Sequence, residues 1–306
     1  MKNKEWKISE VESQSGKIAI VTGSNTGLGF ETAKALAKKG IEVWMACRDE
    51  EKAKDAIDAI KKETASANLT FLQLDLGDLS SVRAAATTFL RKQQKLDILV
   101  NNAGVMMPPY QKTKDGFELQ FGVNYLGHFL LTALLFDAIT SAKEARIIQL
   151  TSLAHNWGDI YFDDPNFEKT PYDKRKSYGQ SKLACLIFAY ELQRRCDAKG
   201  FPIKSMAAHP GISGTELYRY LPGWMKFIGP VFNAIAAQSP RAGALPALRA
   251  ALDPGLQGGE FIGPNGWGEM KGQPVQVDSS PSSKRKPTAD KLWTLSEKMV
   301  GAEFKI

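Results

Sequence analysis

Cysteine and histidine are scarce, because the chain has only three of each among its 306 residues. No C-x-x-C pair occurs, and an odd number of widely spaced cysteines predicts a reducing compartment rather than a disulfide framework or a zinc site. The histidines match no metal-ligand spacing, so we expect buried or surface imidazoles and no metal. These residues are Cys47, Cys185, Cys196, His128, His155 and His209.

Long apolar runs and a strong charge of one sign are also missing. No uninterrupted stretch of about 18 apolar residues occurs, and residues 1–16 lack the apolar core of a signal peptide. We therefore expect a soluble, cytoplasmic protein with no transmembrane segment. The 40 basic and 33 acidic residues give a net charge of +7, which is too dispersed for a nucleic-acid partner. The one dense basic run, at 283–287, is interpreted as a solvated loop.

From residue 17 onward the chain alternates short β-branched runs with longer helical patterns. This alternation predicts an α/β fold with a single Rossmann-type, doubly wound parallel sheet and helices on both faces. No G-x-S-x-G or Walker A sequence occurs, which argues against the hydrolases and nucleotide triphosphatases of this class. Strands are expected at 17–22, 41–46, 69–74, 97–100, 146–150 and 203–207, and helices at 27–39, 50–62, 80–93, 116–138 and 177–195.

A glycine-rich segment, Thr-Gly-Ser-Asn-Thr-Gly-Leu-Gly at 22–29, follows the first expected strand and opens the first expected helix. Glycines at such a turn let the backbone approach a pyrophosphate, whose charge is met by the helix N-terminus. A tight turn without a ligand is the alternative for the glycines alone. The strand before them and the helix after them favour a dinucleotide site.

The second expected strand ends in Cys47-Arg48-Asp49. NAD-binding sites of this type carry an acidic residue here for the ribose hydroxyls, but Cys47 stands in its place and Arg48 follows. Because a guanidinium matches the geometry of a phosphate, we predict NADP(H) as the cofactor. The alternative is that Arg48 caps a solvent-facing turn beside Asp49 and Glu50.

Tyr178 and Lys182 are four positions apart in an expected helix, so both project from one face. A fixed ammonium beside a phenol favours the phenolate, which makes the tyrosine a better proton donor. Taken alone, the pair also fits an amphipathic helix with a snorkelling lysine.

Six motifs together resemble the short-chain dehydrogenase/reductase family, in the order of that family. They span residues 16 to 215 and lie at 22–29, 101–104, 121–129, 150–152, 178–182 and 209–211. Within the family, the segments 46–49, 151–155 and 258–264 are most similar to the retinol dehydrogenase branch and its bacterial relatives, with the protochlorophyllide reductases nearby.

The resemblance implies a role for each matching residue. Tyr178 would donate the proton in reduction and accept it in oxidation. Lys182 would favour the phenolate form of Tyr178 and hold the nicotinamide ribose. Ser152 would hydrogen-bond the substrate oxygen, and Asn124 would support a water path to Lys182. Each of three residues also has a purely structural alternative. Ser152 could cap a strand end, Asn124 a helix turn, and Asp75 the start of a helix. The implied cofactor-binding residues are Gly23, Ser24, Asn25, Thr26, Gly27, Leu28, Gly29, Arg48, Asp75, Leu76, Asn102, Ala103, Gly104, Tyr178, Lys182, Pro210, Gly211, Ile212 and Thr215.

The alternation stops after about residue 213, and no polar linker follows. We therefore expect one domain over 1–306, with a dinucleotide-binding core at 17–215 and a C-terminal cover at 216–306. The aromatic-rich stretch 216–237 is broken by Pro-Gly pairs, and we interpret it as a mobile helical lid over the substrate. Packing on the core and docking on a membrane are the alternatives. Ser239-Pro240 predicts the start of another helix.

The leading functional hypothesis is an NADP(H)-dependent oxidoreductase that interconverts a carbonyl and an alcohol on an apolar small molecule, such as a retinal-like compound, a steroid, a quinone or an aromatic aldehyde. A non-catalytic NADP-binding or sensing protein and a light-dependent tetrapyrrole reductase are the alternatives. Ser152 and Tyr178 are 26 positions apart, farther than is common in the family. The extra loop, at 157–176, lies beside helices that many members use to dimerise, so a monomer and a homodimer both stay open.

Overall fold

The computed structural model describes residues 5–212 and 238–306, and its centre is one eight-stranded sheet in the order β3-β2-β1-β4-β5-β6-β7-β8. Strands β1 to β7 are parallel, and β8 is antiparallel to β7. The six expected strands are confirmed, and β7 and β8 are additional. The bounds are β1 Ile18–Thr22, β2 Glu42–Cys47, β3 Leu69–Gln73, β4 Ile98–Asn101, β5 Ala145–Leu150, β6 Ile203–Ala208, β7 Phe261–Pro264 and β8 Pro274–Gln276.

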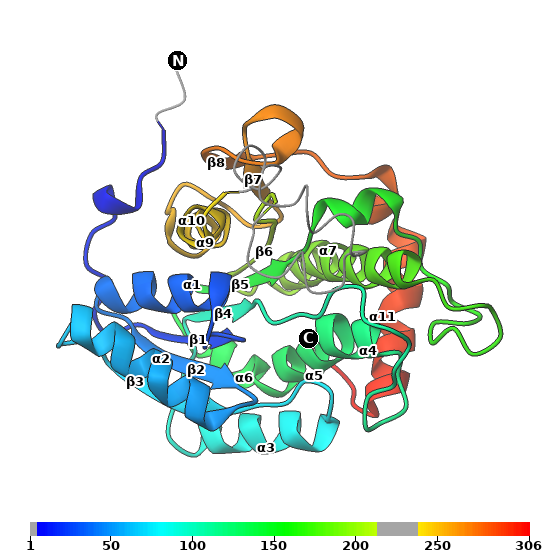
Figure 1. The fold of residues 1–306 in the computed structure, drawn as a ribbon, viewed down its shortest axis with the longest axis horizontal. Coiled ribbons are helices and arrows are strands. Elements are labelled where there is room, and N and C mark those ends of the chain that lie inside the picture. The colour runs from blue at the N-terminus through cyan, green and yellow to red at the C-terminus, as the bar shows by residue number, and fades with distance from the viewer. Residues whose placement is uncertain (1–4, 213–237) are drawn as a thin grey trace, which may run out of the picture.

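Helices cover both faces of the sheet, as Figure 1 shows, so the predicted doubly wound α/β fold is confirmed. One apolar cluster joins the sheet to α1 (Gly27–Lys38), α2 (Glu50–Glu63) and α10 (Leu245–Leu252). A second cluster, on the opposite face, includes residues of α3 (Leu79–Leu90), α5 (Gly127–Leu134), α7 (Lys174–Lys199) and α11 (Lys286–Val300). Because strands β1 and β4 are buried on both faces, their sequences are nearly continuous apolar runs, whereas the equally buried β5 also carries Arg146 and Gln149.

The single helix expected at 116–138 is wrong in detail. The chain forms a short α4 (Leu119–Phe121), a π-helical turn at Gly122–Leu126, then α5 and α6 (Phe136–Thr140). A π-helical turn widens the helix and is common at functional sites. The turn carries Asn124, so the irregularity coincides with a candidate catalytic residue.

The C-terminal part confirms one expectation and corrects another. Ser239 caps α9 (Pro240–Gly243) by accepting a hydrogen bond from Ala242 N, as the sequence predicted. The basic run at 283–287 is not a solvated loop, because α11 starts within it with Pro287 in its first turn. The predicted lid at 216–237 lies outside the described residues. Within the described ranges, no helix has the length and apolar character needed to cross a membrane.

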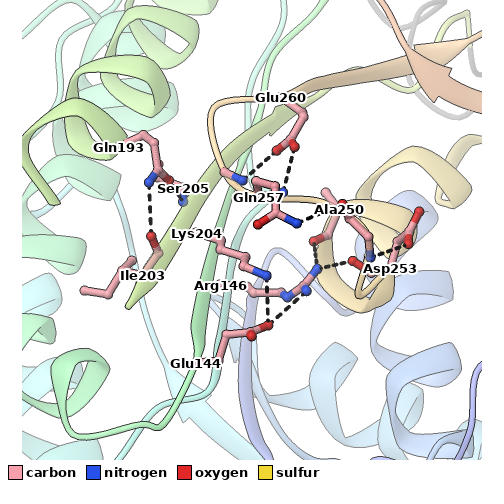
Figure 2. Close-up of polar contacts among 12 residues, drawn as sticks. Glu144, Arg146, Gln193, Ile203, Lys204, Ser205, Ala250, Asp253, Gln257 and Glu260 are labelled. Carbon is pink, nitrogen blue, oxygen red and sulfur yellow. Dashed lines mark hydrogen bonds and ion pairs between the residues drawn. The ribbon is translucent and has the colours of Figure 1, made fainter. Parts of the chain in front are cut away.

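A polar cluster joins α10 to the amino edge of the sheet, at the start of β5 and β6 (Figure 2). The guanidinium of Arg146 donates to the carbonyl oxygens of Ala250 at 3.1 Å and Asp253 at 2.8 Å, and contacts the Glu144 carboxylate at 3.0 Å. Glu144 also pairs with Lys204 at 3.3 Å. This edge of the sheet is therefore closed by paired charges.

Candidate active site

The glycine-rich turn leaves the carboxyl edge of β1 in a conformation that requires glycine. Gly23 and Gly27 have φ values of 64° and 58°, in the left-handed region. A Cβ on Gly29 would lie 2.2 Å from the carbonyl oxygen of Gly23. Among the described residues, the Thr26 side chain makes no capping bond to α1, so backbone N–H groups of its first turn are available to an anion.

The loop after β4 is fastened to this turn. The side-chain nitrogen of Asn102 donates to the Thr22 carbonyl oxygen at 2.8 Å, and the Thr22 hydroxyl accepts the backbone N–H groups of Asn102 and Ala103, both at 2.9 Å. A Cβ on Gly23 would come within 2.9 Å of the Ala103 Cβ. The structure thus brings the predicted cofactor residues at 23–29 and 102–104 into one cradle whose space only glycines leave open, which fits a dinucleotide pyrophosphate.

Arg48 lies exposed directly after β2. The neighbouring acids are paired elsewhere, Asp49 with Lys52 at 2.6 Å and Glu50 with Lys54 at 2.8 Å. Across the described ranges, the Arg48 guanidinium makes no hydrogen bond or ion pair. The geometry therefore does not support the alternative in which Arg48 caps the turn beside Asp49 and Glu50.

Cys47, where an acid was expected, is buried with its Sγ 3.4 Å from the Ser24 hydroxyl oxygen. Burial raises the pKa of this thiol, so it is neutral near pH 7. A neutral thiol does not repel a phosphate. The strand end between the glycine-rich turn and Arg48 therefore carries no negative charge at this position.

Two further predicted cofactor segments lie at the same edge of the sheet. Asp75 accepts the backbone N–H of Gly77 at 2.8 Å, whereas the cap of α3 is Asp78, so the alternative of Asp75 as a helix cap is wrong. Gly211 has a φ of 66°, and Ile212 N donates to the carbonyl oxygen of Met270 at 2.8 Å. Thr215 lies outside the described residues.

The catalytic pair of the prediction lies in α7. The Lys182 Nζ is 5.8 Å from the centre of the Tyr178 ring and donates to the carbonyl oxygen of Leu150 at 3.0 Å. The Thr151 hydroxyl donates to the Lys182 carbonyl oxygen at 2.7 Å. These two bonds fix α7 against the carboxyl end of β5. Lys182 is buried, and no carboxylate in the described part of the chain forms an ion pair with it.

Ser152 follows the same strand. Its hydroxyl accepts the Ala154 backbone N–H at 3.3 Å and caps a 3-10 helix at Leu153–Trp157. Ser152 therefore does make a capping contact, as the alternative interpretation expected. This turn packs directly on α7, because a Cβ on Gly158 would lie 2.3 Å from the carbonyl oxygen of Gly179. Gly179 adjoins Tyr178, and the two glycines therefore let the serine turn reach the tyrosine helix.

Asn124 joins α7 to the segment after β4. Its Oδ1 accepts the Val105 N–H at 2.7 Å, and its Nδ2 donates to the Val105 carbonyl oxygen at 3.0 Å and to the Ser181 hydroxyl at 2.9 Å. A Cβ on Gly104 would lie 3.1 Å from this Oδ1 and 3.4 Å from the Lys182 Nζ. All four predicted catalytic residues thus lie at the carboxyl edge of β4 and β5.

His128, for which the sequence predicted no role, links this site to the glycine-rich turn. Its Nδ1 lies 2.9 Å from the Asn124 carbonyl oxygen and its Nε2 lies 2.8 Å from the Thr22 hydroxyl. Burial lowers the pKa of His128 to about 4, so the ring is neutral near pH 7. The sequence carries one sign that His128 is buried, because this histidine lies within the apolar stretch 126–135.

The other histidines also have protein partners. His155 lies 2.8 Å through Nδ1 from the Ser152 carbonyl oxygen and accepts the Ser280 N–H through Nε2, and burial lowers its pKa. The His209 Nε2 lies 2.9 Å from the Glu269 carboxylate. In the described ranges, no three histidine, cysteine, aspartate or glutamate residues are grouped to hold a metal ion.

Known proteins that are similar to this chain belong to a family of dehydrogenases. The short chain dehydrogenase family model matches residues 17–226. Mouse retinol dehydrogenase 13 is 41% identical over 293 residues, covering 94% of this chain and 84% of the relative, and human retinol dehydrogenase 11 is 40% identical over 286 residues, covering 94% and 86%. The crystal structure of an uncharacterized protein from Mycobacterium paratuberculosis is 36% identical, with a TM-score of 0.81 and coverage of 99% of this chain and 100% of that one. The chain belongs to the short-chain dehydrogenase family.

Proposed function

We propose that this protein is an NADP(H)-dependent oxidoreductase that interconverts a carbonyl and an alcohol on an apolar small molecule. The observation that carries the proposal is the pair Tyr178 and Lys182, held on one face of α7 against the end of β5, with Lys182 buried and Tyr178 partly exposed. The relatives that are named retinol dehydrogenases favour a retinal-like substrate, and steroids, quinones and aromatic aldehydes share its apolar carbonyl chemistry.

The proposed mechanism gives each residue one task. Hydride is what a bound nicotinamide would supply to the carbonyl carbon. In reduction, the Tyr178 hydroxyl donates its proton to the carbonyl oxygen while the Ser152 hydroxyl hydrogen-bonds that oxygen as negative charge develops on it. The Lys182 ammonium stabilises the phenolate that remains. In oxidation the proton moves the opposite way, from the alcohol hydroxyl of the substrate to the Tyr178 oxygen.

Asn124 keeps the two sides of the site together in this proposal, since it binds Val105 on one side and Ser181 on the other. Its carbonyl oxygen already accepts from His128. A water path to Lys182 would therefore run past the Asn124 side chain and Gly104, where the ammonium and the amide are close.

The preference for NADP(H) rests on Arg48. Its guanidinium is exposed and its acidic neighbours are paired with lysines, so it is available to a 2′-phosphate. The glycine-rich turn would supply backbone N–H groups to the pyrophosphate, with Asn102 beside it and Gly104 next to Lys182. A setting in the reducing cytoplasm is compatible with the three free and buried cysteines.

A substrate screen tests the proposal. The purified protein is given NADPH or NADH with all-trans-retinal, a steroid ketone, a quinone and an aromatic aldehyde, in light and in darkness. We expect NADPH oxidation with at least one of these carbonyls in darkness and a higher kcat/KM with NADPH than with NADH. Binding of NADPH without turnover would support a sensing protein, and turnover only in light would support a tetrapyrrole-type reductase.

A further inference from the structure

Gln120, in α4, is a fully buried amide whose contacts converge on the catalytic helix. Its Oε1 accepts the backbone N–H of Met107 at 2.8 Å, and its Nε2 lies 3.0 Å from the Ser177 hydroxyl and 3.0 Å from the Lys174 carbonyl oxygen. The hydroxyl of Tyr172 is also 3.0 Å from this nitrogen. One side chain therefore joins the segment after β4 to the first turn of α7.

Asn124 repeats the same arrangement one helical turn later. Its Oδ1 accepts the Val105 N–H and its Nδ2 donates to the Ser181 hydroxyl. Gln120 and Asn124 are thus two parallel amide bridges between residues 105–107 and α7. The serines that they reach, Ser177 and Ser181, stand one position before Tyr178 and three positions after it.

Met107 shows that the Gln120 bridge holds backbone strain. Its φ is 52°, in the left-handed region, which is strained for a residue that carries a side chain. Such conformations persist where neighbouring bonds fix them, and the Gln120 Oε1 takes the Met107 N–H. The segment that carries this strain follows Gly104 directly, beside Lys182 and Asn124.

We propose that Gln120 is a positioning residue for the reaction: it fixes the first turn of α7, and with it the adjoining Tyr178, at a set distance from the 105–107 segment. The inference rests on the proposed function, since it assigns Tyr178 the proton transfer. Gln120 does not touch the glycine-rich turn, so its effect falls on the chemical step and not on cofactor binding. A misplacement of about 1 Å can lower a rate by about a hundredfold.

Anchoring of the extra loop 157–176 is the competing explanation, because Gln120 also binds Tyr172. Gln180 provides a matched control. It is equally buried, its Oε1 accepts the Tyr161 N–H at 2.9 Å, and its Nε2 donates to the Pro165 carbonyl oxygen at 2.9 Å. It therefore holds the same loop without bridging to residues 105–107.

The test compares Gln120→Met with Gln180→Met, using NADPH and the carbonyl that the wild-type protein reduces fastest. For Gln120→Met we expect kcat to fall about tenfold, while the Kd for NADPH changes less than about twofold. For Gln180→Met we expect kcat within about twofold of wild type. Ser177→Ala should lower kcat less, and the double variant Gln120→Met/Ser177→Ala should lose no more than Gln120→Met alone, because one bridge is removed in both. Equal losses in the two glutamine variants, or a lower Tm of Gln120→Met with unchanged kcat, would overturn the proposal.

Hydrogen exchange keeps the inference separate from the proposed function. In Gln120→Met we expect faster exchange of the Met107 amide and of the first turn of α7, and in Gln180→Met faster exchange only in the loop around Tyr161. A wild-type protein that binds NADPH and reduces no carbonyl would refute the proposed function, while this exchange difference would still report the bridge. Identical exchange in both variants would refute the bridge itself. If Gln120→Met does not fold, Ser177→Ala carries the same comparison with a smaller effect.

Discussion

Among the described residues, one basic side chain is buried at each edge of the sheet, and the two have different partners. At the amino edge Arg146 is 4% exposed and is matched by a carboxylate and two carbonyl oxygens (Figure 2). At the carboxyl edge Lys182 is 6% exposed, and its ammonium has the Leu150 carbonyl oxygen as a partner and no carboxylate in the described ranges. Removing one partner of a buried, fully paired charge leaves the other groups without compensation and lowers stability, whereas a buried charge without a counter-ion is available to a reacting group.

The difference follows from chain direction. Loops at the carboxyl ends of parallel strands meet at one edge, where a ligand fits between them, and the amino edge is left to closing contacts. The glycine-rich turn, Asn102, Ser152 and Gly211 all follow the carboxyl ends of strands. Mutations at the two edges should therefore separate activity from stability.

The largest effect is expected at the carboxyl edge, for Tyr178→Phe. The ring remains and only the acidic hydroxyl is lost, so kcat/KM should fall about a thousandfold, or about 4 kcal/mol of transition-state stabilisation, while NADPH still binds. Lys182→Ala should weaken both turnover and NADPH binding, with little loss in the free energy of unfolding. Steady-state kinetics and NADPH titration measure these effects. Retention of more than a tenth of the wild-type kcat/KM by Tyr178→Phe would show that another group is the acid.

Lowering the pH should reduce the free energy of unfolding through His128, at the carboxyl edge, and not through the Arg146 cluster at the amino edge. Burial lowers the pKa of His128 to about 4 from an ordinary 6.5, so the unfolded chain takes up a proton that the folded chain does not. The stabilisation that the neutral ring provides is complete above pH 6.5 and is lost as the pH falls to 4, a difference of about 3 kcal/mol. Denaturant unfolding at several pH values measures it. His128→Gln should have a flatter profile in this window, and an unchanged slope would show that His128 is not the responsible group.

The sequence predicted the features that depend on neighbouring residues. The six parallel strands, the glycine-rich turn and the pair Tyr178 and Lys182 follow local patterns, and the structure places them as expected. Strands β7 and β8 were missed because they are short and contain glycine and proline, and their pairing comes from the sheet. The run 283–287 was predicted to be a loop, but α11 begins within it, because Pro287 lies in the first turn, where its missing N–H costs no helical hydrogen bond.

The bridges around the site could not be predicted, because they join distant parts of the chain. Gln120 and Ser177 are 57 positions apart, as are Asn124 and Ser181. No local pattern encodes that register, which comes from the packing of the π-helical turn against α7. The same holds for Arg146, whose carbonyl partners lie more than a hundred positions away.

At the amino edge, Arg146→Met should lower stability and leave catalysis unchanged. The substitution removes the donors for two carbonyl oxygens and a partner of Glu144, at an expected cost of about 2 kcal/mol in the free energy of unfolding. Lys204→Met is the matched control, because its pair with Glu144 is partly exposed and should contribute less than about 1 kcal/mol. Denaturant unfolding and kcat are measured on the same samples. A large loss of kcat in folded Arg146→Met would break the distinction between the edges.

The smallest effect concerns Arg48, a basic residue at the carboxyl edge that is exposed rather than buried. Only NADPH carries the 2′-phosphate, so Arg48→Ala should weaken NADPH binding about tenfold, or about 1.4 kcal/mol, and leave NADH nearly unchanged. The effect should shrink as salt rises, because an exposed charge pair is screened. Fluorescence titration with both cofactors at two salt concentrations measures this. Lys52→Ala is the control, since Lys52 is an exposed basic residue in the first turn of α2, four positions after Arg48, and is paired with Asp49. Equal weakening of both cofactors by Arg48→Ala would mean that the guanidinium supports the strand end and not the phosphate, and the carboxyl edge would then hold a basic residue with a structural task like that of Arg146.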